Sequence, residues 1–218
     1  MKKNLNISGK LLKRLPHYHY YLGQLEKRNR DYVSNERLAS DMGLGVDQVR
    51  EDLENLHESL SVSDIHSVKN LLHIVEAYLG YDQANTAVIA GAGNMGRALL
   101  NYPGFRLYGL DILAIFDSDE HVVGTKVGDK EIFPVDRLEE LTDRLKVHMG
   151  IITTPPEPGQ QIADMMIASG IKGIWNFTQA RIKVPKDVEL RNTSLYADYL
   201  WLSQKLERKF DQKIINKQ

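Results

Sequence analysis

The feature that most constrains the fold of this sequence is a short apolar run that leads directly into a glycine-rich turn. The run from Ala87 to Ala90 has the length of a strand, and the next six residues, Gly-Ala-Gly-Asn-Met-Gly, match the pattern G-x-G-x-x-G. Residues 94–101 continue with helical spacing. A strand, a glycine turn and a helix in this order are typical of a Rossmann domain, where the turn binds the diphosphate of a dinucleotide.

Each glycine of this motif has a separate physical task. Gly91 permits the tight turn, Gly93 leaves free the space that a Cβ would take from the diphosphate, and Gly96 lets the helix lie close to the strand. The N–H groups at the start of the helix then point at the phosphates, with help from the helix dipole. We therefore expect a cofactor site at Gly91, Ala92, Gly93, Asn94, Met95 and Gly96. The alternative, a glycine turn that serves only packing, stays open.

A second apolar strand, residues 111–116, ends at Asp117. A carboxylate at this place accepts hydrogen bonds from both ribose hydroxyls of an adenosine and repels a 2′-phosphate, which favours NAD(H) over NADP(H). The next residues, Ser118, Asp119 and Glu120, add negative charge and no arginine.

The rest of the second half alternates between strand and helix patterns. Strands are predicted at 149–153 and 173–177, and helices at 136–146 and 158–169. This alternation predicts an α/β fold with a doubly wound parallel sheet from Thr86 onward. Thr153 and Pro155 follow a predicted strand, so we expect them at the carboxyl edge of the sheet, where ligands bind. Prolines after a strand also commonly do no more than stiffen a loop.

The first 80 residues instead have four helical patterns. The first covers about residues 8–28, the second is capped by Ser34 and ends at Gly43, the third begins near Gly45 or Asp47, and the fourth ends at Gly80. The third pattern has an apolar stripe made by Val46, Val49, Leu53, Leu56 and Leu60. Two short helices separated by residues 42–45 indicate a helix-turn-helix, and the polar residues 81–85 a link between domains.

Charge is unevenly distributed over these helices. Residues 1–30 contain eight basic residues and one acidic residue, whereas residues 31–80 contain three basic and ten acidic residues. Five of the acids lie between Asp47 and Glu58, in the third helix and just after it. A carboxylate that faces DNA phosphates costs Coulomb energy, so this helix is unfavourable for ordinary operator binding unless its charges are a solvated face.

Several classes of function are disfavoured. The sequence has no cysteine, which excludes disulfides, thiolate metal sites and thiol-based redox sensing. Its seven histidines form no His-x3-His or His/Glu cluster, so we expect no metal site. No apolar run approaches the roughly 18 residues of a membrane span and the start lacks a secretory signal, so a cytoplasmic protein is expected. His121 and His148, the histidines of the second half, are poorly placed for catalysis, and we expect a sensor rather than an enzyme.

Taken together, the sequence resembles the Rex family of bacterial redox-sensing transcriptional repressors over about Ile7 to Leu206. The stretches that carry the resemblance are Lys13-Arg14-Leu15-Pro16, Gln48-Val49-Arg50 with Asp52-Leu53, residues 91–99, Asn101-Tyr102-Pro103-Gly104-Phe105, Phe116-Asp117-Ser118-Asp119, residues 170–174 and Asn176-Phe177.

This resemblance implies a winged-helix DNA-binding domain over residues 1–80, a Rossmann domain for NADH or NAD over residues 86–192, and a C-terminal dimerisation helix and basic tail over residues 193–218. The apolar spacing of residues 195–206 predicts a last helix, and the resemblance implies a homodimer whose subunits exchange this helix. In the family NADH closes the dimer and releases operator DNA, whereas NAD permits binding. Tyr102 and Asn176 join the cofactor site by this resemblance, and Tyr102 matches a tyrosine that follows the nicotinamide redox state.

For DNA, the resemblance and the charges name Lys10, Lys13, Arg14, Gln48 and Arg50. Arg50 can contact a guanine through a bidentate bond, and the basic first helix supplies backbone contacts or only solubility. Arg14 matches a family arginine that pairs with an acidic residue of the exchanged helix. Ser194 occupies the expected place of that acid, so either Asp198, one turn on, substitutes or the ion pair is missing.

The sequence departs from the family in its third helix and wing. Glu51 follows Arg50 where a basic residue is usual, and the glycines of the expected wing are absent. Three functions therefore stay open: a repressor that senses the NADH/NAD ratio, a paralogue without operator binding that acts as an NADH-responsive adaptor, and a CoA-binding or dehydrogenase-type enzyme.

Overall fold

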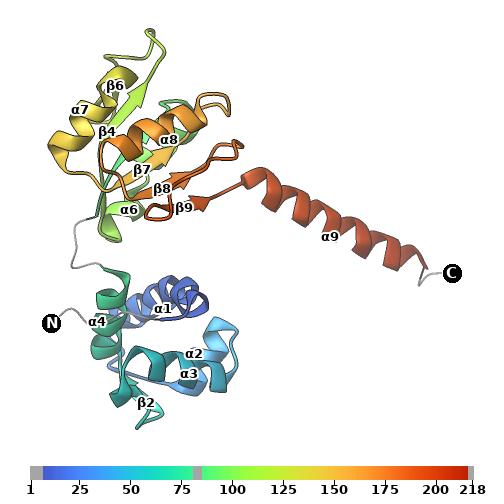
Figure 1. The fold of residues 1–218 in the computed structure, drawn as a ribbon. Helices are drawn as coiled ribbons and strands as arrows, with labels where there is room; N and C mark the ends of the chain where they lie inside the picture. Colours follow the sequence, from blue (N-terminus) through green and yellow to red (C-terminus); the bar gives the residue numbers. More distant parts are fainter. Residues whose placement is uncertain (1–6, 81–84, 216–218) are drawn as a thin grey trace. The chain divides into compact units, whose positions relative to one another are not determined.

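A computed structural model describes residues 7–80 and 85–215, which divide into a first unit up to residue 84 and a second unit from Asn85 onward (Figure 1). Each unit has its own hydrophobic core. The predicted link at residues 81–85 lies mainly outside the described residues, and its last member, Asn85, already belongs to a strand.

The described residues of the first unit form four α-helices around one core and a small sheet. Its elements are α1 (Gly9–Lys27), β1 (Tyr32–Ser34), α2 (Asn35–Met42), α3 (Val46–Leu56), the 3-10 turn η1 (Glu58–Leu60), β2 (Ile65–Ser67) and α4 (Val68–Leu79). The Ser34 side chain caps α2 by accepting a hydrogen bond from the Arg37 N–H, and Gly43 and Gly80 end α2 and α4 in the left-handed region. These features confirm the predicted caps and the helix-turn-helix of α2 and α3.

The third helix ends earlier than its apolar stripe predicted. Leu60 is buried with the predicted stripe, but it belongs to η1, because α3 stops at Leu56 and His57 has extended backbone angles. After η1 the chain enters β2, which pairs antiparallel with β1, with Val33 opposite His66. A turn with one buried leucine thus stands where the resemblance implied a glycine-rich wing.

The second unit is a seven-stranded sheet covered by helices on both faces. Its strands are β3 (Asn85–Ala90), β4 (Leu110–Asp117), β5 (Lys126–Val127), β6 (Lys130–Pro134), β7 (Met149–Ile152), β8 (Gly173–Asn176) and β9 (Glu189–Asn192). Its helices are α5 (Asn94–Leu100), α6 (Pro103–Leu107), the 3-10 turn η2 (Val135–Arg137), α7 (Leu138–Leu145), α8 (Gly159–Ala168) and α9 (Leu195–Ile215).

The order of the strands places β3 between β4 and β7, so the chain leaves the centre of the sheet in opposite directions. All pairs are parallel except the short β5–β6 hairpin. Alternate residues of β3 face opposite layers: Val88 belongs to the same buried cluster as Ile162 of α8, and Ile89 lies in the cluster that Leu99 of α5 contacts. This confirms the doubly wound α/β fold, in which ligands bind where the strand order reverses.

Candidate functional site

The glycine turn lies at the carboxyl end of β3, and the three glycines have different surroundings. A Cβ on Gly91 would come within 2.7 Å of the Thr153 carbonyl carbon, and Gly91 has φ +106°. A Cβ on Gly96 would collide with the Gly91 carbonyl oxygen. A Cβ on Gly93 would meet nothing within 4 Å. Gly91 and Gly96 are therefore required for folding of the turn, whereas Gly93 leaves open space.

Backbone N–H groups collect around that space. The first bond of α5 is donated by the Arg97 N–H to the Gly93 carbonyl, so the N–H groups of Asn94, Met95 and Gly96 precede the hydrogen-bonded part of the helix. No side chain of the described residues caps α5 at Gly93. An anion is the natural partner of such N–H groups.

The carboxylate of Asp117 lies next to the turn, at the end of the neighbouring strand β4. One of its oxygens accepts a hydrogen bond from the Ala92 N–H at 2.6 Å and the other accepts one from the Asp119 N–H at 2.9 Å. An ionised carboxylate has about four acceptor sites. Asp117 is thus held in place by the backbone and retains acceptor sites for the hydroxyls of a sugar.

A cleft of about 540 Å³ opens beside the turn and Asp117. Its lining comes from the ends of β3 and β4, from the residues that follow β7, and from η2 and α8. The residues that line it are Ala90, Gly91, Gly93, Phe116, Asp117, Ser118, Val135, Asp136, Thr153, Thr154, Pro155, Pro158, Gln161, Ile162 and Met165. Five of the predicted cofactor residues line the cleft: Gly91, Gly93, Asp117, Thr153 and Pro155.

The wall on the α8 side was not predicted from the sequence. Gln161, Ile162 and Met165 belong to the helix that follows Thr153–Pro158, and the position of this helix over the carboxyl edge brings them to the cleft. The available signal was the predicted helix at 158–169, since the first turn of a helix that follows a strand lies at the same edge of the sheet.

Two features of the cleft fit a dinucleotide. The Thr154 hydroxyl is buried and has no hydrogen-bond partner among the described residues, so a bound polar group can satisfy it. A second hollow of about 300 Å³ shares Asp117, Ser118, Val135 and Asp136 with the cleft and adds Glu120. Three carboxylates therefore surround the end of the cleft at Asp117, which is unfavourable for an additional phosphate there.

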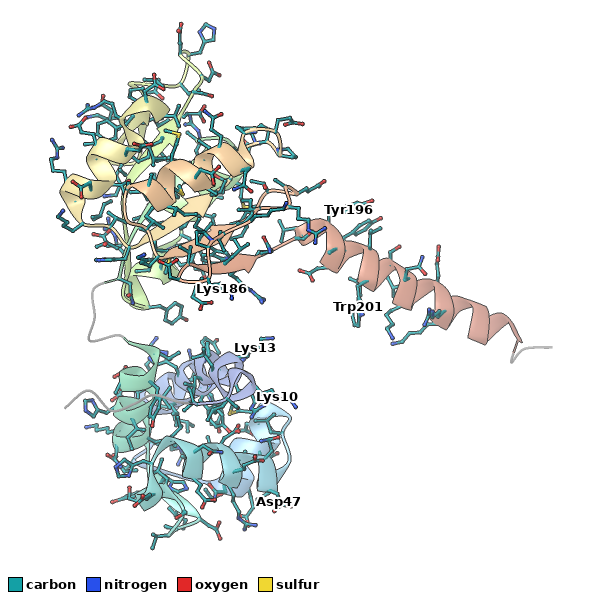
Figure 2. The ribbon with its side chains drawn as sticks, in the orientation of Figure 1. Lys10, Lys13, Asp47, Lys186, Tyr196 and Trp201 are labelled. Atoms are coloured by element: carbon teal, nitrogen blue, oxygen red, sulfur yellow. The ribbon has the colours of Figure 1, made fainter. Side chains whose placement is uncertain are left out.

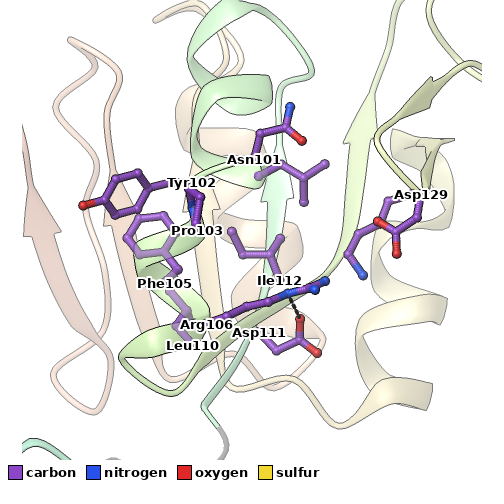
Figure 3. Close-up of a pocket in the computed structure, with 11 residues that line it drawn as sticks. Asn101, Tyr102, Pro103, Phe105, Arg106, Leu110, Asp111, Ile112 and Asp129 are labelled. Carbon is purple, nitrogen blue, oxygen red and sulfur yellow. Dashed lines mark ion pairs between the residues drawn. The ribbon is translucent and has the colours of Figure 1, made fainter.

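Tyr102 and Asn176 do not line this cleft. Tyr102 is 53% exposed and its ring packs edge-on against Phe105, with centroids 5.0 Å apart. It lines a separate cavity of about 300 Å³ with Asn101, Arg106 and the first residues of β4 (Figure 3). Asn176 is buried and bonds Asn192, the Ala180 carbonyl and the Thr178 N–H. A cofactor role for either residue remains a prediction.

The histidines of the second unit lie away from the cleft lining. His121 is exposed in the turn after Asp119, and His148 is exposed just before β7, at the amino end of that strand. Among the described residues no three His, Asp or Glu side chains are grouped so as to hold a metal ion. No described helix has the length and apolar character needed to cross a membrane.

In the first unit, Arg14 and Asp52 form an ion pair between α1 and α3. The Arg14 Nε donates to the Asp52 carboxylate at 2.7 Å, and a second guanidinium nitrogen donates to the other oxygen. The Tyr18 hydroxyl and the Gln48 amide also donate to this carboxylate, at 3.1 Å each. The pair raises the pKa of Arg14, and burial next to Asp52 raises that of Tyr18. Asp52 is 1% exposed, so it does not face a ligand.

This geometry removes one carboxylate from the acidic surface predicted for the third helix. Of the five acids between Asp47 and Glu58, Asp52 points into the unit and is neutralised by Arg14, because helical spacing puts it on the buried stripe beside Val49 and Leu53. Asp47, Glu51, Glu54 and Glu58 remain exposed. Gln48, predicted to bind DNA, is half-buried and bonds Asp52 and Glu51.

The remaining predicted DNA residues are on the surface of the first unit. Lys10 and Lys13 are exposed on α1 (Figure 2) and pair with no carboxylate of the described residues. Arg50 is exposed on α3, and its guanidinium bonds Asp64 and Asp47. These pairs raise the pKa of Arg50, chiefly through the hydrogen bond to Asp64.

Comparison with known protein families matches both units. The family model described as "CoA binding domain" matches residues 82–180, and the model described as "Putative DNA-binding protein N-terminus" matches residues 6–54.

Two curated relatives cover almost the whole chain. The redox-sensing transcriptional repressor Rex of Clostridium botulinum (strain Eklund 17B / Type B) is 38% identical over 195 residues, which are 89% of this chain and 93% of the relative. The redox-sensing transcriptional repressor Rex of Clostridium beijerinckii is 37% identical over 202 residues, which are 93% of this chain and 96% of the relative.

Solved structures agree with this similarity. The crystal structure of RSP, a Rex-family repressor, superposes with a TM-score of 0.84 at 34% identity and covers 95% of this chain and 98% of its own. RSP in complex with β-NADH superposes with a TM-score of 0.85 at 34% identity, over 96% of this chain and 98% of its own. RSP in complex with β-NAD+ and operator DNA superposes with a TM-score of 0.86 at 33% identity, over 96% of this chain and 97% of its own.

Proposed function

The chain belongs to the Rex family of redox-sensing transcriptional repressors, and from this membership we propose that it represses transcription in response to the NADH/NAD ratio. In this proposal the second unit binds NADH or NAD and the first unit binds operator DNA. RSP has been solved both with β-NADH and with β-NAD+ and operator DNA, which supports binding of both ligands, and the two family models support this division of tasks between the units.

The observation that carries the proposal is the cleft beside the glycine turn. Gly93 leaves open space next to the N–H groups that begin α5, where a diphosphate fits, and Asp117 lies at the same edge of the sheet, where it can accept bonds from a ribose. Phe116, Val135, Ile162 and Met165 line the cleft with apolar surface suited to an adenine ring.

The specificity of the cleft follows from its charge. Asp117, Glu120 and Asp136 lie around the sugar end, so a 2′-phosphate there would be repelled and NAD(H) is preferred over NADP(H). The nicotinamide ring of the bound cofactor supplies the redox signal, since it is cationic when oxidised and neutral when reduced. The protein has to bind the two forms with different affinity in its two conformations, because only a differential affinity shifts an equilibrium.

We propose that the two conformations belong to a homodimer that exchanges α9. The helix has Leu195, Tyr199, Leu202 and Leu206 on one stripe, all exposed in the single chain. Tyr196 and Trp201 project from opposite sides of it (Figure 2), so it is apolar on more than one side. A helix of this composition needs partners around it, as in an exchanged dimer. NADH then favours the dimer released from DNA, and NAD the DNA-bound dimer.

We further propose that the chain is a regulator without catalytic activity and that it works in the cytoplasm. Its relatives are named transcriptional repressors. The residues that line the cleft include no histidine or lysine to transfer a proton during hydride chemistry.

A second candidate function is an NADH-responsive adaptor without operator binding. It is favoured by the exposed Asp47, Glu51 and Glu54 of α3, which oppose binding to phosphates. A gel shift against a genomic fragment library at low salt separates the two candidates. Sequence-specific retardation supports the repressor, and its absence together with NADH binding supports the adaptor.

The cofactor proposal is tested by calorimetry of the dialysed full chain with NADH, NAD, NADPH and CoA in turn. We expect binding of NADH and NAD, with NADPH weaker by about tenfold or more because one extra phosphate meets three carboxylates. Equal affinity for NADH and NADPH, or binding of CoA alone, would contradict the proposed sensor.

A further inference from the structure

Asp64, a residue of the segment between η1 and β2, holds the exposed arginine of α3. The Arg50 Nε donates to one Asp64 oxygen at 3.1 Å and Nη2 approaches the other oxygen at 3.5 Å, so the carboxylate takes one edge of the guanidinium as a fork. Nη1 also donates to Asp47 at 3.4 Å. The carboxylate of Asp64 is thus the principal partner of Arg50.

Asp64 is itself fixed to the buried part of the unit. Its oxygen Oδ1 accepts a hydrogen bond from the Asn35 side chain at 2.9 Å, and its carbonyl accepts one from the Asn35 N–H at 2.9 Å. Asn35 is buried and bonds the buried His66 of β2. The hydrogen bonds from His66 to Asn35 and from Asn35 to Asp64 therefore fix the position of the carboxylate. The bonds of Asp64 to Arg50 in turn orient the guanidinium before any ligand binds.

The bonds of Arg50 leave two N–H groups for a ligand. A guanidinium has five N–H donors. Asp64 takes one from Nε and one from Nη2, and Asp47 takes one from Nη1, which leaves one on Nη1 and one on Nη2. A pair of acceptors, the O6 and N7 of guanine in the major groove, is the commonest specific partner of an arginine. Arg50 lies in the second turn of the helix that begins at Val46, near the end that contacts base edges in helix-turn-helix proteins.

We propose that Asp64 is a positioning residue for DNA specificity, which holds Arg50 so that its Nη1–Nη2 edge meets one guanine of the operator. This inference rests on the proposed operator binding. The exposed carboxylates of α3 weaken attraction to phosphates for every sequence alike, whereas the fork on Arg50 acts at one base pair. An arginine side chain that is already ordered also loses less conformational entropy on binding than a mobile arginine side chain.

The experiment starts with the full chain, NAD and a library of duplexes that contain 20 randomised base pairs, at about 50 mM salt so that phosphate attraction is strong. Sequencing of the retained duplexes identifies guanines that the protein prefers. The affinity is then measured by fluorescence anisotropy for the best duplex and for versions with each other base pair at a preferred guanine. We expect the wild-type chain to prefer one guanine by about fivefold or more.

Asp64→Asn and Arg50→Lys should both reduce the preference at that same guanine toward one. Glu54→Gln is the matched control, because it removes an exposed charge of α3 that makes no bond to Arg50. It should raise affinity for all duplexes alike and leave the preference unchanged. Asp64→Glu keeps the charge but displaces the carboxylate, and should also reduce the preference. Thermal unfolding and NADH binding show that each variant is folded.

The outcomes separate this inference from the proposed function. If Asp64→Asn tightens binding to every duplex and keeps the guanine preference, Asp64 only repels phosphates and the inference is overturned. The same follows if the wild-type chain binds DNA without any preferred guanine that depends on Arg50. If the wild-type chain retains no duplex in either cofactor state, operator binding itself fails, and the inference fails with it.

Discussion

Three glycines of a single turn show how similar residues can have different physical tasks. Gly91 and Gly96 are surrounded by backbone atoms at distances that no side chain tolerates, whereas Gly93 borders empty space in the cleft. Its backbone angles, φ −69° and ψ −171°, are open to any residue. Gly91 and Gly96 thus serve the fold, whereas Gly93 leaves space for the proposed cofactor.

This difference predicts opposite outcomes for two alanine substitutions. Gly93→Ala should leave the free energy of unfolding within about 0.5 kcal/mol of wild type and weaken NADH binding by about tenfold or more, because the new methyl group enters the diphosphate space. Gly96→Ala should destabilise the second unit by about 3 kcal/mol, since its methyl group collides with the Gly91 carbonyl. Urea unfolding and calorimetry measure both quantities. Unchanged NADH affinity in a folded Gly93→Ala variant would contradict the placement of the cofactor.

The ion pair of Arg14 and Asp52 predicts a stability effect at the residue scale. Arg14→Ala leaves the Asp52 charge in a buried site where, among the described residues, Tyr18 and Gln48 are the remaining side-chain donors, and should cost about 3 kcal/mol. This is the low end for a broken buried pair, because the Arg14 side chain is 24% exposed. Lys13→Ala, at the exposed neighbour, is the control and should change stability by less than about 0.5 kcal/mol.

A double variant tests whether the charge of Asp52 causes the loss. Arg14→Met combined with Asp52→Leu replaces the pair by apolar side chains of similar size and should recover part of the stability, because the unpaired charge is gone although the buried Tyr18 hydroxyl loses its acceptor. If the single and double variants were equally unstable in urea, packing of the Arg14 stem, not the unpaired carboxylate, would be the cause.

At the scale of elements, the small sheet of β1 and β2 carries the buried histidine of the first unit. It is joined to α2 through His66, whose Nε2 lies 2.9 Å from Asn35 Oδ1. Because the Asn35 Nδ2 donates to Asp64, its oxygen is the acceptor and His66 donates. Burial lowers the pKa of His66 below its ordinary 6.5, with a smaller opposite effect of the Asp64 carboxylate.

The sign of the resulting pH dependence follows from proton counts. At pH values below 6.5 the unfolded chain binds a proton at this histidine more readily than the folded chain, so stability falls as pH falls. The contribution is fully present above pH 6.5 and decreases as the pH drops through the lowered pKa. His66→Gln should therefore flatten the decline in urea midpoint between about pH 7.5 and 5.5. His73→Gln, at an exposed histidine of α4, should leave the decline unchanged; an equal effect of both variants would refute the assignment to His66.

At the scale of the whole molecule, α9 is an element whose apolar side chains are left exposed within one chain. None of its residues up to position 209 is buried. Exposed apolar area of this extent marks an interaction surface, and in the proposed dimer a second copy of the chain would supply matching apolar area by symmetry.

The proposed dimer predicts a specific sensitivity to charge on one stripe of α9. Leu202→Glu combined with Leu206→Glu should convert the protein to a monomer of 24.8 kDa in sedimentation experiments, because two carboxylates would be buried at the interface. Gln204→Glu adds the same type of charge on the opposite side of the helix and is the control. A double variant that sediments as a dimer would show that this stripe is not the dimer interface.

The sequence by itself determined the local features of this protein: the glycine turn, the caps at Ser34, Gly43 and Gly80, and the alternation that makes the second unit doubly wound. Such features depend on the spacing of residue types within a short segment, and this spacing is visible in the sequence itself. Tertiary structure decided which charges meet. Asp52 looked like part of an acidic surface until the fold buried it against Arg14, 38 positions away. Likewise α8 completes the cleft and Asp64 holds Arg50 because distant segments fold together, and no local pattern records that proximity.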